Sequence, residues 1–164
     1  MANLTMAYIA ASARAGDSPE SKQKSDAQRA WLIDCIRDVW NGFAEGFDAQ
    51  WKDVTASAAK ARPETEGSSS SRRSLIWDEV KVQMPDSVRE QFIHEVWEDT
   101  IGFFGCFTIR RIVGVAHIQD FESIEDVKLR AACERRALQL AMDMLLGKEE
   151  LRNIDELVTA IKQL

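Results

Sequence analysis

Apolar side chains recur along this chain at intervals of three and four residues, a spacing that predicts amphipathic helices. A first helix is expected over residues 3–13, where the apolar face comprises Leu4, Ala7, Tyr8 and Ala11. The longest such pattern runs from Trp31 to Trp51 and covers roughly six turns. We expect this aromatic stripe to pack in a core rather than to stack on bases, because no Lys or Arg is interleaved on that face.

The segments on either side of this long pattern are rich in small and polar residues. Residues 16–25 contain Gly, Pro and Ser, so we expect a loop that ends where Ser25 and Gln28 form a capping box. Residues 56–73 are dominated by Thr, Ala, Ser and Gly, and we expect them to form a flexible surface insertion.

Helix signals resume in the second half of the chain. Asp86 or Ser87 follows a proline and can cap a helix. Gly102 and Gly105 are expected to break or kink the path of this helix. The pattern therefore predicts a separate helix over residues 106–117.

Two more helices are expected towards the end of the chain. A start signal over residues 123–126 precedes a long helix that Gly147 is expected to end. Asn153, with Glu156 three residues later, is expected to open a short final helix. No segment shows the period-two alternation of a strand. The sequence therefore predicts an all-α fold in a single helical domain, residues 1–164.

Composition and charge narrow the classes of function. The net charge of -6 and the pI near 5.0 argue against binding to nucleic acid or to an anionic membrane. The cysteines lack Cys-x-x-Cys spacing and lie in apolar segments, which favours reduced core thiols in a cytoplasmic protein. They are Cys35, Cys106 and Cys133. With no ligand-like spacing of His and Cys, no metal site is expected.

Two adjacent arginines, Arg110 and Arg111, interrupt the most apolar stretch of the chain, residues 97–122. Burying an unpaired guanidinium is costly, so both must reach a carboxylate, a cleft or a ligand. Their side chains leave a helix about 100° apart and cannot share one small pocket unless the helix end forms its wall. Ion pairs and contacts with the oxygens of a ligand both stay open at this point. The carboxylates available for such ion pairs are Asp99, Asp120 and Glu122.

His117 and the carboxylates of Asp120 and Glu122 are weaker candidates for acid–base chemistry. A single histidine at a helix end is more often a capping or packing residue than a base. We therefore expect no catalytic residue in this chain.

Several short motifs stand out in and around the apolar stretch. They are Asp99-Thr-Ile-Gly-Phe-Phe104, Ile109-Arg-Arg-Ile-Val-Gly-Val-Ala-His117, Asp120-Phe-Glu-Ser-Ile124, Arg130-Ala-Ala-Cys-Glu-Arg135, Ile154-Asp-Glu-Leu157 and Asn3-Leu-Thr-Met-Ala-Tyr8. Together they resemble the C-terminal part of S-methyl-5-thioribose kinases. Only residues 55–85 or so have no counterpart, so the resemblance covers most of the chain.

This resemblance implies a fold and a function. The family fold is the two-lobed protein-kinase-like (aminoglycoside phosphotransferase) type, of which this chain would be the helical C-terminal lobe without the nucleotide lobe. The family reaction transfers the γ-phosphate of ATP to the anomeric hydroxyl of methylthioribose in methionine salvage. The resemblance further implies that Arg110 and Arg111 bind the ribose hydroxyls. Phe107 departs from the polar residue that the family often carries before the twin arginine.

The chain carries no Gly-rich nucleotide loop, no His-Gly-Asp-like catalytic loop and no Asp-x-Glu-like metal motif. ATP and Mg²⁺ are therefore expected to bind to the complete family enzyme and not to this chain alone, which we expect to be inactive. Two alternatives stay open. The chain is either one half of a split kinase, working with a separately encoded N-terminal half, or a non-catalytic helical module that binds a sugar or a partner. In the second case a homodimer would cover the apolar surface left by the missing lobe.

Overall fold

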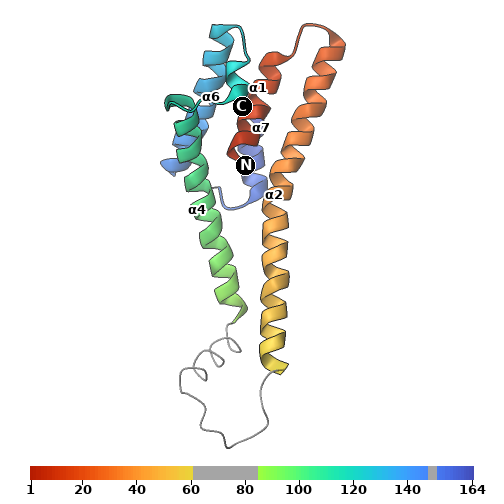
Figure 1. Cartoon of the computed structure of the whole chain (residues 1–164), viewed down its shortest axis with the longest axis vertical. Helices are drawn as coiled ribbons and strands as arrows, with labels where there is room; N and C mark the ends of the chain where they lie inside the picture. The colour runs from red at the N-terminus through yellow and green to blue at the C-terminus, as the bar shows by residue number, and fades with distance from the viewer. Residues whose placement is uncertain (61–84, 148–150) are drawn as a thin grey trace, which may run out of the picture. The chain divides into compact units, whose positions relative to one another are not determined.

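The computed structural model describes residues 1–60, 85–147 and 151–164 of the chain. Within these ranges most of the chain is helical (Figure 1). The helices are α1 (Ala2–Arg14), α2 (Pro19–Lys60), α4 (Asp86–Val113), α5 (Gln119–Glu122), α6 (Val127–Leu145) and α7 (Ile154–Lys162). No strand occurs in the same ranges, and the predicted all-α fold is confirmed.

The helices form two compact units. The larger unit comprises Met1–Trp40 and Trp97–Leu164, and the smaller unit comprises Asn41–Val96. Both α2 and α4 contribute residues to each unit. The expectation of a single domain stays a prediction, and each unit is described by itself below.

The predicted flexible insertion at residues 56–73 begins inside α2. Because α2 continues to Lys60, residues 56–60 are helical. The rest of the insertion, residues 61–73, lies outside the described residues.

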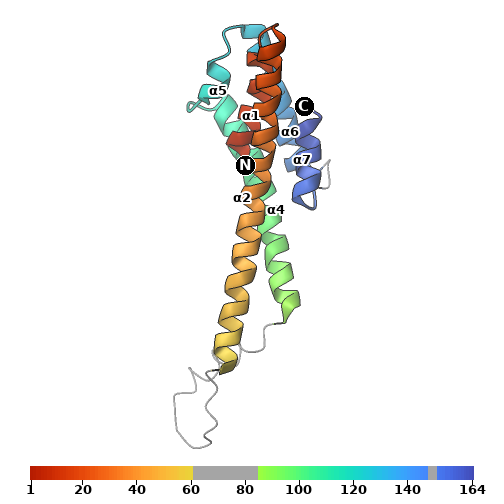
Figure 2. The ribbon, with the colours of Figure 1, turned by 90° about the vertical axis from the view of Figure 1, so that its right-hand side faces the viewer.

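The core of the larger unit forms around α1, which packs against α5 and α6. Figure 2 shows α5 on one side of α1 and α7 on the other. Tyr8 and Ala11 of the predicted apolar face are buried, whereas Leu4 and Ala7 are half-buried. The side chains at the centre of this core are almost fully buried: Met6, Ile36, Cys133, Leu157 and Ile161.

The start of α2 lies earlier than predicted, because Pro19 rather than Ser25 opens the helix. Ser18 Oγ accepts a hydrogen bond from the backbone N–H of Ser21 at 3.1 Å, so Ser18 caps the helix and Pro19 takes its first position. Ser25 lies inside the helix and donates its hydroxyl hydrogen to Ala11 O at 2.8 Å, which ties α2 to α1. The predicted loop is therefore wrong beyond Ser18.

The long apolar stripe of α2 is only partly a core face. Leu32 and Ile36 are buried in the larger unit, but Trp31 leaves 61% of its surface exposed. The expectation that the whole stripe packs in a core is thus wrong at Trp31, and also at Val39 and Phe43, which are 52% and 42% exposed. The reason is geometric, since Trp31 lies about 100° round the helix from Leu32.

Helix α4 runs without a break through Gly102 and Gly105, where the sequence predicts a break or kink. A Cβ atom on Gly105 would lie 2.7 Å from Leu145 Cγ and 3.0 Å from Ala141 O. This glycine therefore allows the close approach of α6 and does not end the helix. A Cβ atom on Gly102 would meet no atom within 4 Å, so Gly102 imposes no packing constraint of this kind.

The end of α4 at Val113 comes before the predicted end near His117. Gly114 N donates a hydrogen bond to Arg110 O at 3.0 Å, and a side chain on Gly114 would collide with that oxygen. The separate helix predicted over residues 106–117 is therefore the last two turns of α4 followed by a loop.

The remaining helix ends follow the predicted capping residues. Asp126 Oδ1 accepts hydrogen bonds from the backbone N–H groups at the start of α6, at 2.8 and 3.2 Å. Gly147 follows the C-cap residue Leu146 of α6 and adopts a φ of 62°, as expected of a helix-ending glycine. Asn153 Oδ1 accepts two backbone hydrogen bonds at 3.0 Å and opens α7.

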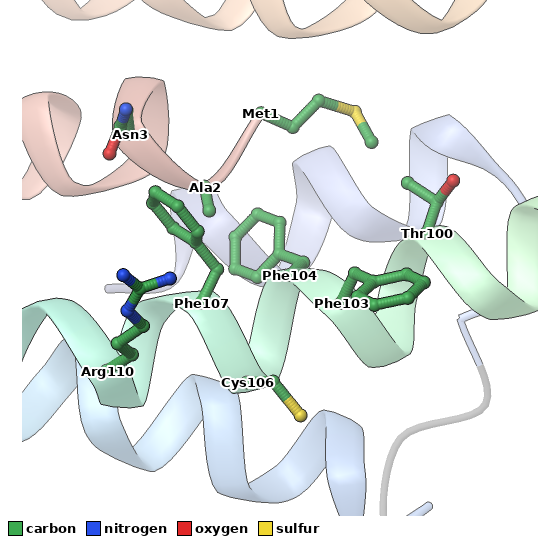
Figure 3. Close-up of a pocket in the computed structure, with 9 residues that line it drawn as sticks. All are labelled: Met1, Ala2, Asn3, Thr100, Phe103, Phe104, Cys106, Phe107 and Arg110. Atoms are coloured by element: carbon green, nitrogen blue, oxygen red, sulfur yellow. The ribbon is translucent and has the colours of Figure 1, made fainter.

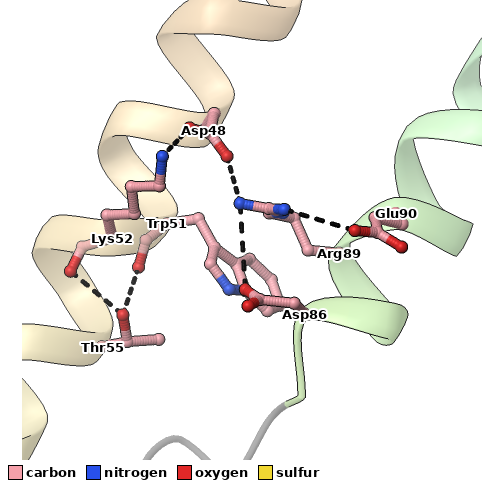
Figure 4. Close-up of polar contacts among 7 residues, drawn as sticks. All are labelled: Asp48, Trp51, Lys52, Thr55, Asp86, Arg89 and Glu90. Atoms are coloured by element: carbon pink, nitrogen blue, oxygen red, sulfur yellow. Dashed lines mark hydrogen bonds and ion pairs between the residues drawn. The ribbon is translucent and has the colours of Figure 1, made fainter.

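The smaller unit is held together by aromatic contacts and by charge. Phe47 of α2 stacks on Phe92 of α4 with ring centroids 4.9 Å apart. The Asp48 carboxylate pairs with Lys52 on the same helix and with Arg89 on α4 (Figure 4). These partners lower the pKa of Asp48, chiefly through the hydrogen bond from Lys52 and then through the charge of Arg89.

Candidate functional site

The C-terminal half of α4 positions the two arginines singled out by the sequence. Trp97 fixes the beginning of this half, because its ring is 2% exposed and its indole Nε1 donates a hydrogen bond to Leu151 O at 2.7 Å. Roughly two turns further on, Gly105 sets the contact with α6, and Arg110 and Arg111 lie in the last turn. The packing of α4 within the larger unit therefore determines where the guanidinium groups lie.

An open cavity of about 440 Å³ lies between the first turn of α1 and this half of α4. All the residues that line it belong to the larger unit. They are Met1, Ala2, Asn3, Thr100, Phe103, Phe104, Cys106, Phe107 and Arg110 (Figure 3). The volume is in the range of small-molecule sites, and most of the lining is apolar.

Arg110 brings a positive charge to this cavity. Its side chain is exposed, and its guanidinium makes no hydrogen bond or ion pair with any residue that the structure describes. Asp120, one of the predicted partners for the arginine pair, instead forms an ion pair with Arg14 at 3.3 Å. Asp99 and Glu122 are exposed. The donors of Arg110 are thus available to a ligand in the cavity.

Arg111 points elsewhere, as the 100° angle between helical neighbours requires. Its Nη1 donates a hydrogen bond to Ala116 O at 3.2 Å, and its guanidinium carbon lies 5.5 Å from the centre of the Phe107 ring. Its Nε is buried without a hydrogen-bond partner among the described residues. Arg111 therefore holds the loop after α4 and supports the Phe107 side of the cavity.

The weaker candidates do not gather into a second site. His117 is exposed in the loop after α4, and Asp120 is engaged by Arg14. In residues 1–60, 85–147 and 151–164, no group of three His, Cys, Asp or Glu side chains could hold a metal ion. Within the same ranges, no helix is both long and apolar enough to cross a membrane.

The sequence predicts core thiols for all three cysteines, but the cysteines differ in their exposure to solvent. Cys133 is buried in the core, and this burial raises the pKa of its thiol. Cys35 is half-buried, but Cys106 is exposed at the cavity. The expectation of a core thiol is therefore wrong for Cys106. The apolar residues that surround it in sequence lie on different faces of α4, so the apolar context does not determine its exposure.

Sequence reasoning missed the contribution of α1 to the cavity. Asn3 lies opposite Arg110 because the first turn of α1 and the C-terminal half of α4 face each other across the cavity (Figure 3). The one signal that could have found it is the resemblance itself, which pairs the motif beginning at Asn3 with the motif around the arginines.

Comparison with known proteins identifies relatives over almost the full length of the chain. Methylthioribose kinase 2 of Oryza sativa subsp. japonica is 32% identical over 162 residues, which cover 99% of this chain and 34% of that kinase. Methylthioribose kinase of Cronobacter sakazakii is 30% identical over 161 residues, which cover 98% of this chain and 33% of that protein. No protein-family model matches the chain.

The described residues form a helical fold, and almost the whole chain is similar to one part of these kinases. More narrowly, it is homologous to methylthioribose kinases and corresponds to their C-terminal part, as the motifs in its sequence predict. The chain spans about one third of the length of the relatives that it matches.

Proposed function

We propose that this chain is the sugar-binding part of an ATP-dependent methylthioribose kinase. In the complete enzyme the γ-phosphate of ATP would pass to the anomeric hydroxyl of methylthioribose, a step of methionine salvage. The observation that carries the proposal is the Arg110 guanidinium, which lines the cavity without a partner among the described residues. The relatives named methylthioribose kinase supply the identity of the sugar.

The chemistry of Arg110 suits a sugar. A guanidinium presents several N–H donors in one plane, and neighbouring ribose hydroxyls present acceptors at a matching spacing. Arg110 is exposed, so it stays charged at little cost before the sugar binds. The sugar contact that the resemblance implies for Arg111 stays a prediction, since its Nη1 is already bound to Ala116 O.

The described residues do not fit ATP and Mg²⁺. No cluster of carboxylates or other ligating groups among them is placed to hold a metal ion, and the sequence carries no Gly-rich nucleotide loop. These residues are therefore assigned no role in phosphoryl transfer. ATP and Mg²⁺ would bind in the two thirds of such a kinase to which this chain does not correspond.

Isothermal titration calorimetry with methylthioribose tests the sugar site. Arg110→Ala is expected to weaken binding at least tenfold, because a hydrogen bond from a charged group contributes about 1.5–3 kcal/mol. Arg110→Lys should retain part of the affinity, since it keeps the charge but loses the planar donor pair. The matched control is Arg135→Ala, which removes an exposed arginine on α6 that does not line the cavity.

Equal affinity of the wild-type chain and Arg110→Ala would contradict the proposal. A second assay follows phosphate transfer from ATP to methylthioribose. Purified chain alone is expected to show no transfer, and measurable transfer would refute the assignment of ATP binding to the rest of the kinase.

A second candidate function is that of one half of a kinase made of two chains. Two exposed valines close to the arginine pair favour it, because Val113 at the end of α4 is 70% exposed and Val115 in the loop that follows is 99% exposed. Apolar side chains exposed together often mark a contact surface. Adding the remaining two thirds of the Oryza relative as a separate protein should then restore phosphate transfer. Unchanged inactivity after this addition argues for a binding module without catalysis.

A further inference from the structure

The cavity beside Arg110 has two chemically different ends. Figure 3 shows Asn3 and Arg110 at one end and the Phe103 ring at the other, next to Thr100. Between the two ends the wall is formed by aromatic rings, with the Phe107 ring nearer to Arg110. A ligand that fills the cavity therefore meets charge and amide groups at one end and mainly carbon at the other.

Phe103 is the unusual residue of this wall. It is 74% exposed, whereas the neighbouring Phe104 is 4% exposed and belongs to the core. The Phe103 ring therefore contributes little to the packing of the larger unit in the unbound chain. Covering such a ring with an apolar group releases water from both surfaces and favours binding.

Asn3 occupies the opposite end. Its side chain lies on the first turn of α1, faces the same end of the cavity as Arg110, and is exposed (Figure 3). An amide can both donate and accept, so it complements the hydroxyls of a sugar that also accept from a guanidinium. The residues next to Asn3 in the sequence do not by themselves reveal this role, which depends on α1 and α4 lining the same cavity.

We propose that the cavity binds its sugar in one orientation, which Asn3 and Phe103 set, and that Phe103 determines the preference for the methylthio substituent. The ribose hydroxyls lie towards Asn3 and Arg110, and the apolar 5-methylthio group lies against the Phe103 ring. This inference rests on the proposed sugar-binding function and adds to it the residue that selects the substituent. Ribose, which carries a hydroxyl in place of the methylthio group, would leave the Phe103 ring uncovered.

Calorimetric titration of the full chain with methylthioribose and with ribose tests this orientation. Phe103→Ala is expected to weaken methylthioribose binding roughly tenfold, the lower limit for losing one apolar contact in a pocket, and to leave ribose binding unchanged. Asn3→Ala should weaken both sugars by the same factor, roughly fivefold for one neutral hydrogen bond. Phe103→Leu should retain most of the preference for methylthioribose, because it keeps an apolar side chain.

The matched control is Trp31→Ala, which removes an exposed aromatic ring of the larger unit that does not line the cavity. Circular dichroism establishes that each variant keeps its helices. The inference is overturned if Phe103→Ala weakens the binding of both sugars equally or of neither, while Arg110→Ala still weakens binding at least tenfold. If the wild-type chain binds neither sugar, the proposed function itself fails and the inference fails with it.

Discussion

Replacing Gly105 by Ala tests whether this glycine serves the contact between α4 and α6. The residue lies in the middle of α4, where glycine is unfavourable for helix stability. A Cβ atom there would lie 2.7 Å from Leu145 Cγ, 3.1 Å from Leu145 Cδ2 and 3.0 Å from Ala141 O. Gly102 offers a matched control on the same helix, because a Cβ atom there would have nothing within 4 Å.

The two substitutions should change stability in opposite directions. Alanine in place of glycine in a helix interior gains about 1 kcal/mol, and Gly102→Ala is expected to show this gain. Gly105→Ala makes the same gain but also overpacks the interface, at a cost of about 1–3 kcal/mol. Leu145 is partly exposed and can rotate away, whereas the backbone oxygen of Ala141 cannot. We therefore expect a net loss of about 1 kcal/mol for Gly105→Ala.

Urea denaturation followed by circular dichroism measures the difference between the two variants. A separation of about 2 kcal/mol corresponds to about 1 M urea between the two midpoints, with a typical urea dependence of about 2 kcal/mol per molar. The reasoning is refuted if Gly105→Ala is as stable as Gly102→Ala. In that outcome α6 yields to the added methyl group without cost, and Gly105 has no role in fixing α4.

Two further predictions concern ionisable groups. Because the pKa of Asp48 is lowered by Lys52 and Arg89, its ionised form stabilises the smaller unit above the ordinary carboxyl pKa of 3.8, and this contribution is lost as the pH falls through the lowered value. Unfolding curves measured between neutral and strongly acidic pH should show this loss in the wild-type chain and not in Asp48→Asn; identical curves would contradict it. Under native conditions a thiol-reactive reagent should label Cys106 first and Cys133 last, because Cys133 is buried and its thiol pKa is raised. Mass spectrometry of the labelled chain gives the order, and early labelling of Cys133 would be inconsistent with its place in the core.

Local sequence signals predicted the helix ends well where one residue decides the outcome. Asp126 and Asn153 cap their helices through their own side chains, and Gly147 needs only its own backbone freedom. The start of α2 was mispredicted because two capping patterns lie close together. Ser18 caps the helix and Pro19 takes its first position, whereas the hydroxyl of Ser25 donates a hydrogen bond to α1.

The site was predicted only in part, and for a physical reason. The cost of burying a charge predicts that Arg110 and Arg111 reach a cleft, a carboxylate or a ligand, and the helical angle predicts that they point in different directions. Arg110 lines the cavity, whereas Arg111 donates to Ala116 O. The cavity itself depends on α1 and α4, which are far apart in the sequence. Gly105 is a second case in which local sequence is not enough. Its sequence context suggests a helix break, and only the position of α6 explains why a glycine stands there.

The position of Arg110 depends on contacts that lie away from the cavity. Trp97 anchors α4 through Leu151, and Gly105 sets its distance from α6. Arg110 follows Gly105 by about one and a half turns on the same rigid helix, so a shift at the glycine moves the guanidinium relative to Asn3 on α1. Catalytic and binding groups lose function when they are displaced by about 1 Å. A glycine that does not line the cavity therefore supports the proposed sugar site, because it helps to set where α4 lies beside α1.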